Sequence, residues 1–258
     1  MSLTKFTLLN LKRLLNDWAN LIFSILLPVA LFLFFGVAQA QQQGTTAPEA
    51  AHGNISAIVM VSMAVFGGAI AACGSVGSIV AEQNTGWGRQ LALTSLSQRQ
   101  LLCERLLEIL VRALLPLLAL FITGFATNAE MDTLTWFLAF GACLIGSMPF
   151  GLYGMMVGLL FRTESAVGFA ASLISLFGFI GNAFIPLNEE LFNISRFTPM
   201  YGSVALARYP LTDGYQLLSG DPHVVHDPLW YALVNLAAWT LFFTLVCLLL
   251  GKRQKGRG

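Results

Sequence analysis

The residues best placed to do chemistry in this chain lie in the short stretch Asp221–Asp227. It reads Asp-Pro-His-Val-Val-His-Asp, and its histidines and aspartates are residue types that bind metal ions. No further cluster of metal-ligand residues accompanies the stretch, so a polar turn on an external loop explains it better than a metal site. We also find no Ser/His/Asp or Cys/His arrangement that indicates catalysis, and we expect neither a metal site nor an enzyme active site.

A second candidate is the pair Glu108 and Arg112, four residues apart near one end of an apolar segment. A glutamate four residues before an arginine is in the favourable order for an ion pair on a helix. We expect the two side chains to pair with each other. A proton relay is the alternative, because ionisable residues inside a membrane are often functional. The sequence contains no Walker-type loop to bind the phosphates of ATP.

The composition indicates an integral membrane protein. The chain has 258 residues, of which 56% are hydrophobic and 10% are charged, whereas soluble domains carry about 25% charged residues. A net charge of +1 argues against a nucleic-acid partner, which would require a basic patch. The four cysteines have neither disulfide nor metal spacing and are interpreted as packing residues: Cys73, Cys103, Cys143 and Cys247.

Six apolar segments are each close to the ~20 residues that a membrane-spanning helix needs. They predict an all-α membrane protein with six transmembrane helices in one domain, residues 1–258. The predicted spans are Trp18–Ala38, Ile55–Ala81, Leu101–Thr127, Leu134–Phe161, Ala166–Pro186 and Leu229–Gly251.

The distribution of basic residues predicts the orientation of these spans. With the N-terminus inside, twelve of the fourteen Lys and Arg residues fall on the inner side, and Arg196 and Arg208 fall outside. The positive-inside rule therefore places both termini in the cytoplasm. Residues 1–17 have polar and apolar side chains on opposite faces at helical spacing, which predicts an amphipathic helix at the membrane interface. Lys5, Lys12 and Arg13 lie on its polar face.

The loop after the second span has more structure than a simple connection requires. From Glu82 to Arg112 it contains a broken polar run, a short leucine-bearing piece and a Ser-x-x-Gln helix start at Ser97–Gln100. Four of the fourteen Lys and Arg residues lie here. We interpret the loop, residues 82–100, as a surface that a cytoplasmic partner contacts.

The segment between the last two spans, residues 187–228, is apolar but interrupted. Asn188 can cap a short helix that runs through Phe197, and Met200–Tyr209 can form a second helix that Pro210 stops. Such a segment is a candidate for short re-entrant helices, which a membrane tolerates where protein buries them.

Small residues crowd the second, fourth and fifth spans and include a Gly-x-x-x-Gly at Gly154–Gly158. Small residues let helix backbones approach closely in lipid. The pattern predicts tight helix packing, either within one chain or between chains. Pro28, Pro116 and Pro149 lie inside predicted spans and should kink them.

Several short stretches, in their order along the chain, resemble the membrane subunit of ABC-2 type transporters. Pro28 lies in the middle of the first span. Glu82-Gln83-Asn84-Thr85-Gly86 leads into Leu91-Ala92-Leu93-Thr94-Ser95, Phe184-Ile185-Pro186-Leu187 closes the fifth span, and Ser195–Met200 follows. The resemblance covers nearly the whole chain. One departure is Gln83, because many family members have arginine directly after the loop glutamate.

The resemblance implies a permease for export that works with partners in the cytoplasmic membrane. The partners would be a separate ABC ATPase subunit, a second permease copy or paralogue, and membrane lipids. ATP and Mg²⁺ would bind to the ATPase, with no cofactor on this chain. The loop residues expected to contact the ATPase are Glu82, Gly86, Arg89, Leu91 and Leu93, while Lys5, Lys12 and Arg13 belong to the connecting helix.

The predicted substrate path lies on the second and fifth spans. Its candidate residues are Met60, Met63, Phe66, Phe177, Asn182 and Phe184. Apolar walls with few polar groups favour a hydrophobic drug, an antimicrobial peptide or a lipid-like substrate, as in multidrug resistance. Packing against lipid or neighbouring helices is the alternative for each residue. An ion-coupled carrier and a membrane-embedded lipid-modifying enzyme remain alternative functions, and both homodimer and heterodimer are open.

Overall fold

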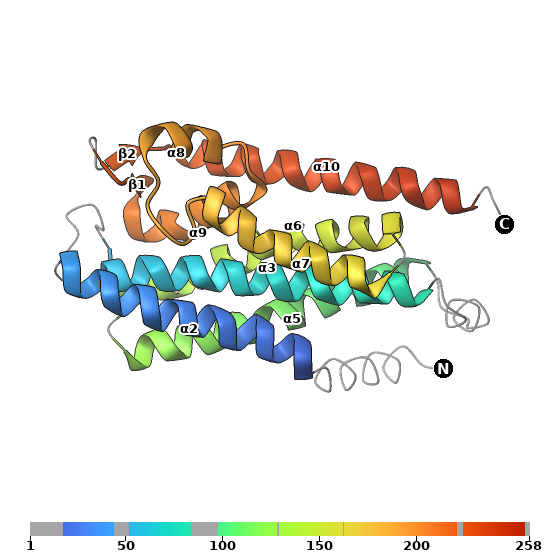
Figure 1. Ribbon diagram of the computed structural model, residues 1–258, viewed down its shortest axis with the longest axis horizontal. Coiled ribbons are helices and arrows are strands. Elements are labelled where there is room, and N and C mark those ends of the chain that lie inside the picture. The colour runs from blue at the N-terminus through green and yellow to red at the C-terminus, as the bar shows by residue number, and fades with distance from the viewer. Residues whose placement is uncertain are drawn as a thin grey trace.

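The computed structural model describes residues 18–43, 52–83, 98–127, 129–161, 163–220 and 224–255. Six long helices run along an elongated bundle (Figure 1). They are α2 (Trp18–Gln43), α3 (Ile55–Gln83), α5 (Gln98–Ala126), α6 (Thr133–Phe161), α7 (Glu164–Ile180) and α10 (Leu229–Lys255). Between α7 and α10 lie α8 (Glu189–Ser195), α9 (Pro199–Thr212), β1 (Tyr215–Leu217) and β2 (Val224–His226).

Helix α3 forms the centre of the bundle. Its apolar part, Ile55–Ser75, is fully buried within the chain, and α3 contacts α2, α5, α6, α7 and α9. A helix that is apolar all round its surface is expected in such a position.

Glycines allow the backbones of α3 and α6 to approach each other closely. A Cβ atom on Gly154 would lie 2.1 Å from the backbone oxygen of Cys73, and one on Gly68 would lie 2.3 Å from Ser147 Oγ. Both separations are far below van der Waals contact. The predicted close packing at Gly154 is therefore contact within one chain.

Within the part of the chain that the structure describes, four helices contain an apolar stretch long enough to cross a membrane. These stretches are Ile55–Ser75, Ile109–Ala126, Thr133–Phe161 and Leu229–Leu250. The apolar parts of α2 and α7 are shorter, Ser24–Gly36 and Ser165–Ile180. Each of the six predicted spans contains one of the long helices, and in the described residues four of these helices have an apolar stretch of spanning length.

The fifth predicted span ends earlier than expected. Helix α7 stops at Ile180 rather than continuing to Pro186, because the chain turns after Gly181. The Gly181 N–H donates to Phe177 O at 2.7 Å, and Asn182 takes a left-handed conformation with φ of 59°. Asparagine tolerates this conformation better than most residues.

The segment between α7 and α10 begins as predicted and then departs from the prediction. Asn188 caps α8 by accepting a hydrogen bond from Leu191 N–H at 2.9 Å, but α8 ends at Ser195 rather than Phe197. Thr198 caps α9, and Pro210 does not stop it. A proline near a helix end removes one hydrogen bond, and α9 continues to Thr212, where Asp213 N–H bonds to Tyr209 O at 2.9 Å.

A small β-hairpin follows α9, and the all-α prediction missed it. Strands β1 and β2 pair antiparallel, with Gln216 opposite Val225. Three-residue strands are too short to show an alternating pattern in the sequence. Tertiary contacts hold the hairpin in place, including the bond from Ser219 N–H to Leu187 O at 2.9 Å.

The two ends of the bundle consist of different elements (Figure 1). The C-terminal ends of α3, α6 and α10 and the N-terminal end of α5 lie toward the end at the right of the figure. Helices α8 and α9 and the hairpin lie at the opposite end. The C-terminal end of α3 and the short helices therefore lie at opposite ends of the bundle.

Candidate functional site

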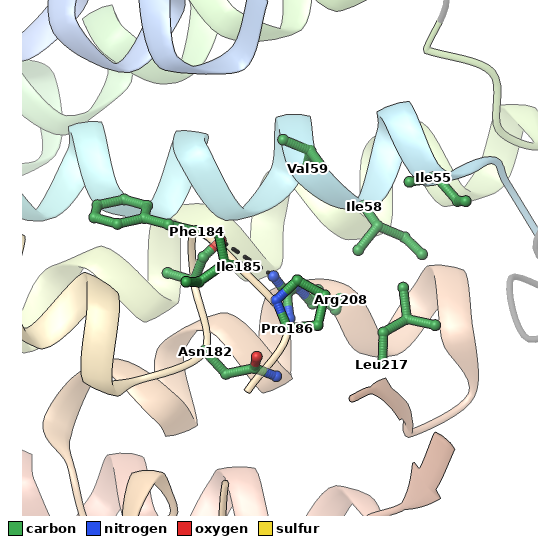
Figure 2. Close-up of a pocket in the computed structure, with 10 residues that line it drawn as sticks. Ile55, Ile58, Val59, Asn182, Phe184, Ile185, Pro186, Arg208 and Leu217 are labelled. Carbon is green, nitrogen blue, oxygen red and sulfur yellow. Dashed lines mark hydrogen bonds between the residues drawn. The ribbon is translucent and has the colours of Figure 1, made fainter. Parts of the chain in front are cut away.

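A small cavity lies where α3, the turn after α7, and α9 meet (Figure 2). Its volume is about 20 Å³. Apolar side chains of α3 form one wall, and polar groups from the turn and from α9 lie on the other side. The residues that line it include Ile55, Ile58, Val59, Asn182, Phe184 and Arg208.

The structure brings three of the predicted path residues together. Asn182 and Phe184 line the cavity. Phe66 packs edge-to-face against Phe184, with ring centroids 4.7 Å apart and an interplanar angle of 89°. Phe66 and Phe184 are both buried, so in this conformation their rings serve packing between α3 and the turn after α7.

The other predicted path residues lie in the same apolar core but do not line the cavity. Met60 and Met63 are fully buried on α3. Phe177 is half-buried and contacts Tyr153 of α6 at a centroid distance of 6.0 Å.

Asn182 holds its side-chain amide in one orientation. Its Oδ1 accepts a hydrogen bond from Leu187 N–H at 3.2 Å. Its Nδ2 is buried and has no hydrogen-bond partner. Exchanging the two amide atoms would set a donor against the Leu187 N–H, so this bond determines which atom is the nitrogen.

Arg208 is buried on α9, although the sequence indicated only an external charge. Its Nε donates to Ser62 Oγ of α3 at 2.7 Å, and its Nη2 donates to Ala183 O at 3.2 Å. Burial lowers the pKa of Arg208 from 12.5 to about 10, so the guanidinium stays charged near neutral pH. A lone arginine in an otherwise apolar predicted helix was the sequence signal for this position.

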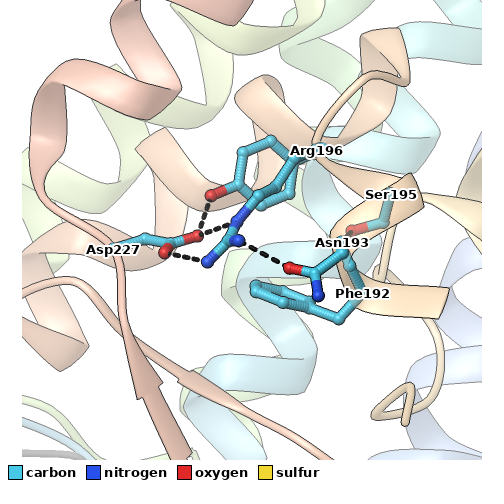
Figure 3. A network of polar contacts seen from close by, with 6 residues as sticks. Phe192, Asn193, Ser195, Arg196 and Asp227 are labelled. Carbon is cyan, nitrogen blue, oxygen red and sulfur yellow. Dashed lines mark hydrogen bonds and ion pairs between the residues drawn. The ribbon is translucent and has the colours of Figure 1, made fainter. Parts of the chain in front are cut away.

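A second polar cluster joins α8, α9 and the start of α10 (Figure 3). The Arg196 guanidinium donates from Nε to Asp227 Oδ2 at 3.0 Å and from Nη2 to Asp227 Oδ1 at 2.5 Å. Its Nη1 donates to Asn193 Oδ1 at 2.7 Å, and Tyr201 OH donates to Asp227 Oδ2. Asp227, expected in a polar turn, is thus a buried ion-pair partner.

Two residues of α10 fasten the turn between α8 and α9. Asn235 Nδ2 donates to the backbone oxygens of Arg196 and Thr198, at 2.7 and 3.1 Å. Trp239 Nε1 donates to Phe197 O at 3.1 Å. These bonds attach three successive carbonyl groups of the turn, those of residues 196–198, to α10.

Most of the predicted contact residues for the ATPase lie outside the described residues. Gly86, Arg89, Leu91 and Leu93 belong to this group, as do Lys5, Lys12 and Arg13 of the predicted connecting helix. Glu82 lies in the last turn of α3. In the described part of the chain, no three His, Cys, Asp or Glu side chains gather as metal ligands.

The bundle of long apolar helices defines an integral membrane protein. The family model described as ABC-2 type transporter matches residues 3–209, and the chain belongs to this family. It is also similar to a Bacillus subtilis (strain 168) protein named "Putative transport permease YvfS". The two are 24% identical over 263 residues, covering 98% of each chain. The chain is accordingly a transport permease, the membrane component of its system, and its family implies association with an ABC ATPase.

Proposed function

We propose that this permease is the membrane subunit of an ATP-driven exporter. It would pair with a second permease, identical or related, and each would rest on a separate ATPase chain that binds ATP and Mg²⁺. The observation that carries the proposal is the family match over residues 3–209. This range includes the loop at 82–100 and the segment that contains α8 and most of α9. Six spans with both termini in the cytoplasm are part of the proposal.

Helix α3 is suited to carry a movement from the ATPase to the outer end of the bundle. It leads directly into the loop proposed to contact the ATPase, since α3 ends at Gln83. At its other end, Ser62 of α3 accepts a hydrogen bond from Arg208 of α9. A densely packed helix moves as a rigid body, so a displacement near Glu82 would reach α9.

The proposed substrate path runs beside the outer half of α3. When the bundle opens, Met63, Phe66, Phe177, Asn182 and Phe184 would line it, with α8 and α9 as re-entrant helices that close its outer end. Several aromatic rings meet there, including Phe179 and Phe184 with centroids 4.7 Å apart. Apolar aromatic walls suit a hydrophobic drug, an antimicrobial peptide or a lipid-like substrate.

Gentle purification of the tagged chain from its native membrane tests the proposal. We expect an ATPase with a Walker motif to co-purify in equal amount. Glu82→Ala, and replacement of residues 86–89 by a Gly-Ser linker, should each reduce its recovery at least tenfold. Glu190→Ala is the matched control, because Glu190 is an exposed residue of α8 at the other end of the bundle, and it should leave recovery unchanged.

The outcomes separate the parts of this proposal. Recovery of the ATPase with both loop variants would keep the exporter and reject the loop as its contact. Absence of any ATPase under conditions that preserve the permease in the membrane extract would reject the ATP-driven mechanism.

A further inference from the structure

The cavity between α3 and α9 is bordered by two hydrogen-bond donors that lack negative partners. The Nδ2 of Asn182 has no partner, and the side chain is only 2% exposed. The guanidinium of Arg208 lines the same cavity and is also buried. Figure 2 shows the two residues on the side of the cavity away from the α3 wall.

In the described ranges, no neighbouring carboxylate balances the charge of Arg208. Among the residues that the structure describes, the hydrogen bonds of Arg208 go to a hydroxyl and a backbone carbonyl, and no ion pair includes it. A guanidinium has five N–H donors. A buried cation with neutral partners is costly unless an anion balances it.

The cavity has room for one small atom. A cavity of about 10–15 Å³ can hold one water molecule, and this cavity has a volume of about 20 Å³. A halide ion or one oxygen of a carboxylate or phosphate fits this space. A water molecule also fits, but it would leave the positive charge unbalanced.

We propose that the cavity is an anion site in which Arg208 and Asn182 bind a halide or a single anionic oxygen of an organic acid. The bound anion accepts from the Asn182 amide and balances the Arg208 guanidinium. It thereby ties the turn after α7 to α9, while Ser62 ties α9 to α3. The inference goes beyond the proposed function, because it concerns anion binding by this chain alone.

Thermal unfolding of the full-length chain in zwitterionic lipid nanodiscs tests the site. Sodium chloride is compared with sodium gluconate at equal ionic strength. The hydroxyl-bearing carbons next to the gluconate carboxylate would have to lose water against the apolar lining, which keeps this anion out of the cavity. We expect the midpoint of unfolding to be higher in chloride by about 2–4 °C. An equal midpoint in the two salts would overturn the proposal.

The variant Asn182→Asp provides an internal test. Aspartate keeps an oxygen to accept from Leu187 N–H and tolerates the left-handed backbone at this position. Its second oxygen takes the place of the unpartnered amide and supplies the negative charge itself. We expect this variant to be as stable as the wild type in chloride and to show no difference between the salts.

Two further variants distinguish this cavity from anion binding elsewhere. Arg208→Gln should also abolish the difference in unfolding midpoint between the two salts. The double variant Arg208→Gln with Asn182→Asp should have a still lower midpoint, because the new carboxylate then lacks its cation. Arg196→Gln should lower the midpoint but keep the difference between salts. A chloride effect that persists in both Asn182→Asp and Arg208→Gln would place the anion elsewhere and reject the site.

Formate, octanoate and octanol, each added to the gluconate buffer, identify the source of the anionic group. Stabilisation by formate equal to that by octanoate indicates a dissolved anion. Stabilisation by octanoate well above that by formate, with none by octanol, indicates an acid group carried on an apolar molecule. Stabilisation by octanol equal to that by octanoate would contradict an anion site.

Discussion

Arg196 and Asp227 are 31 residues apart in the sequence and form a two-point ion pair, with Nε–Oδ2 and Nη2–Oδ1 distances of 3.0 and 2.5 Å. The pair joins the end of α8 to the residue before Pro228 and α10. The Asp227 side chain is 3% exposed and that of Arg196 is 27% exposed. The pair therefore fixes the outer short helices against a long helix of the bundle with defined geometry.

Replacing Arg196 by glutamine should destabilise the protein strongly. It leaves the Asp227 carboxylate buried with one main partner, and losing one member of a buried pair costs about 3–5 kcal/mol. Arg196→Lys keeps the charge but not the two-point geometry, so it should cost less. Thermal unfolding in nanodiscs measures both variants. A midpoint for Arg196→Gln equal to that of the wild type would show that the pair contributes no stability.

Tyr201 should make stability fall at alkaline pH. Burial raises the pKa of Tyr201 well above its ordinary value of 10, and its hydrogen bond to Asp227 raises that pKa further. The folded state then keeps the phenol proton that the unfolded state loses above pH 10. The contribution is complete below pH 10 and declines above it, toward the pKa of the folded state.

The variant Tyr201→Phe isolates this effect. Below pH 10 it should be less stable than the wild type by about 1–2 kcal/mol, because a buried hydrogen bond is lost. Above pH 10 the difference between the two proteins should shrink. Unfolding midpoints of both proteins from pH 8 to 11.5 provide the comparison, and a constant difference across this range would contradict the prediction.

Gly154→Ala should destabilise the contact between α6 and α3. The new methyl group would lie 2.1 Å from the backbone oxygen of Cys73, and backbone atoms cannot rotate away, so we expect a cost of about 1–3 kcal/mol or more. Gly141→Ala on the same helix is the control. No neighbouring atom lies within 4 Å of its added methyl group, and alanine favours a helix over glycine by about 0.5–1 kcal/mol. Unfolding midpoints should therefore move in opposite directions.

The rings of Phe66 and Phe184 should stabilise the folded chain jointly. A double-mutant cycle with Phe66→Leu and Phe184→Leu should give a coupling energy of about 0.5–1.5 kcal/mol, as for other edge-to-face pairs. Phe137, which is 74% exposed on α6, serves as a control. Its replacement by leucine should be additive with Phe66→Leu. A coupling energy of zero for Phe66 and Phe184 would show that they do not pack in this way in the membrane.

Several features followed from the sequence because their causes are local. Long apolar segments favour helices, and each of the six predicted spans contains a long helix, although the fifth ends at Ile180 rather than Pro186. Asn188 was recognisable as a helix cap, since a cap depends on residues within one turn. The stretches that resemble ABC-2 type transporters were also readable, and the family match confirmed them.

Other features depend on residues that are distant in the sequence, and only the tertiary structure decided them. Asp227 looked like part of a polar turn, and its pairing with Arg196 required the start of α10 to pack against α9 and the turn between α8 and α9. The sequence indicated an external charge at Arg208, whereas in the structure α9 packs against α3 and buries Arg208 beside Ser62. Helix periodicity and caps report neighbours within a few residues, whereas the burial of a charge depends on which helices meet. The sequence therefore determined the class of protein and its helices, and the packing of α3 with α9 decided where the polar groups gather.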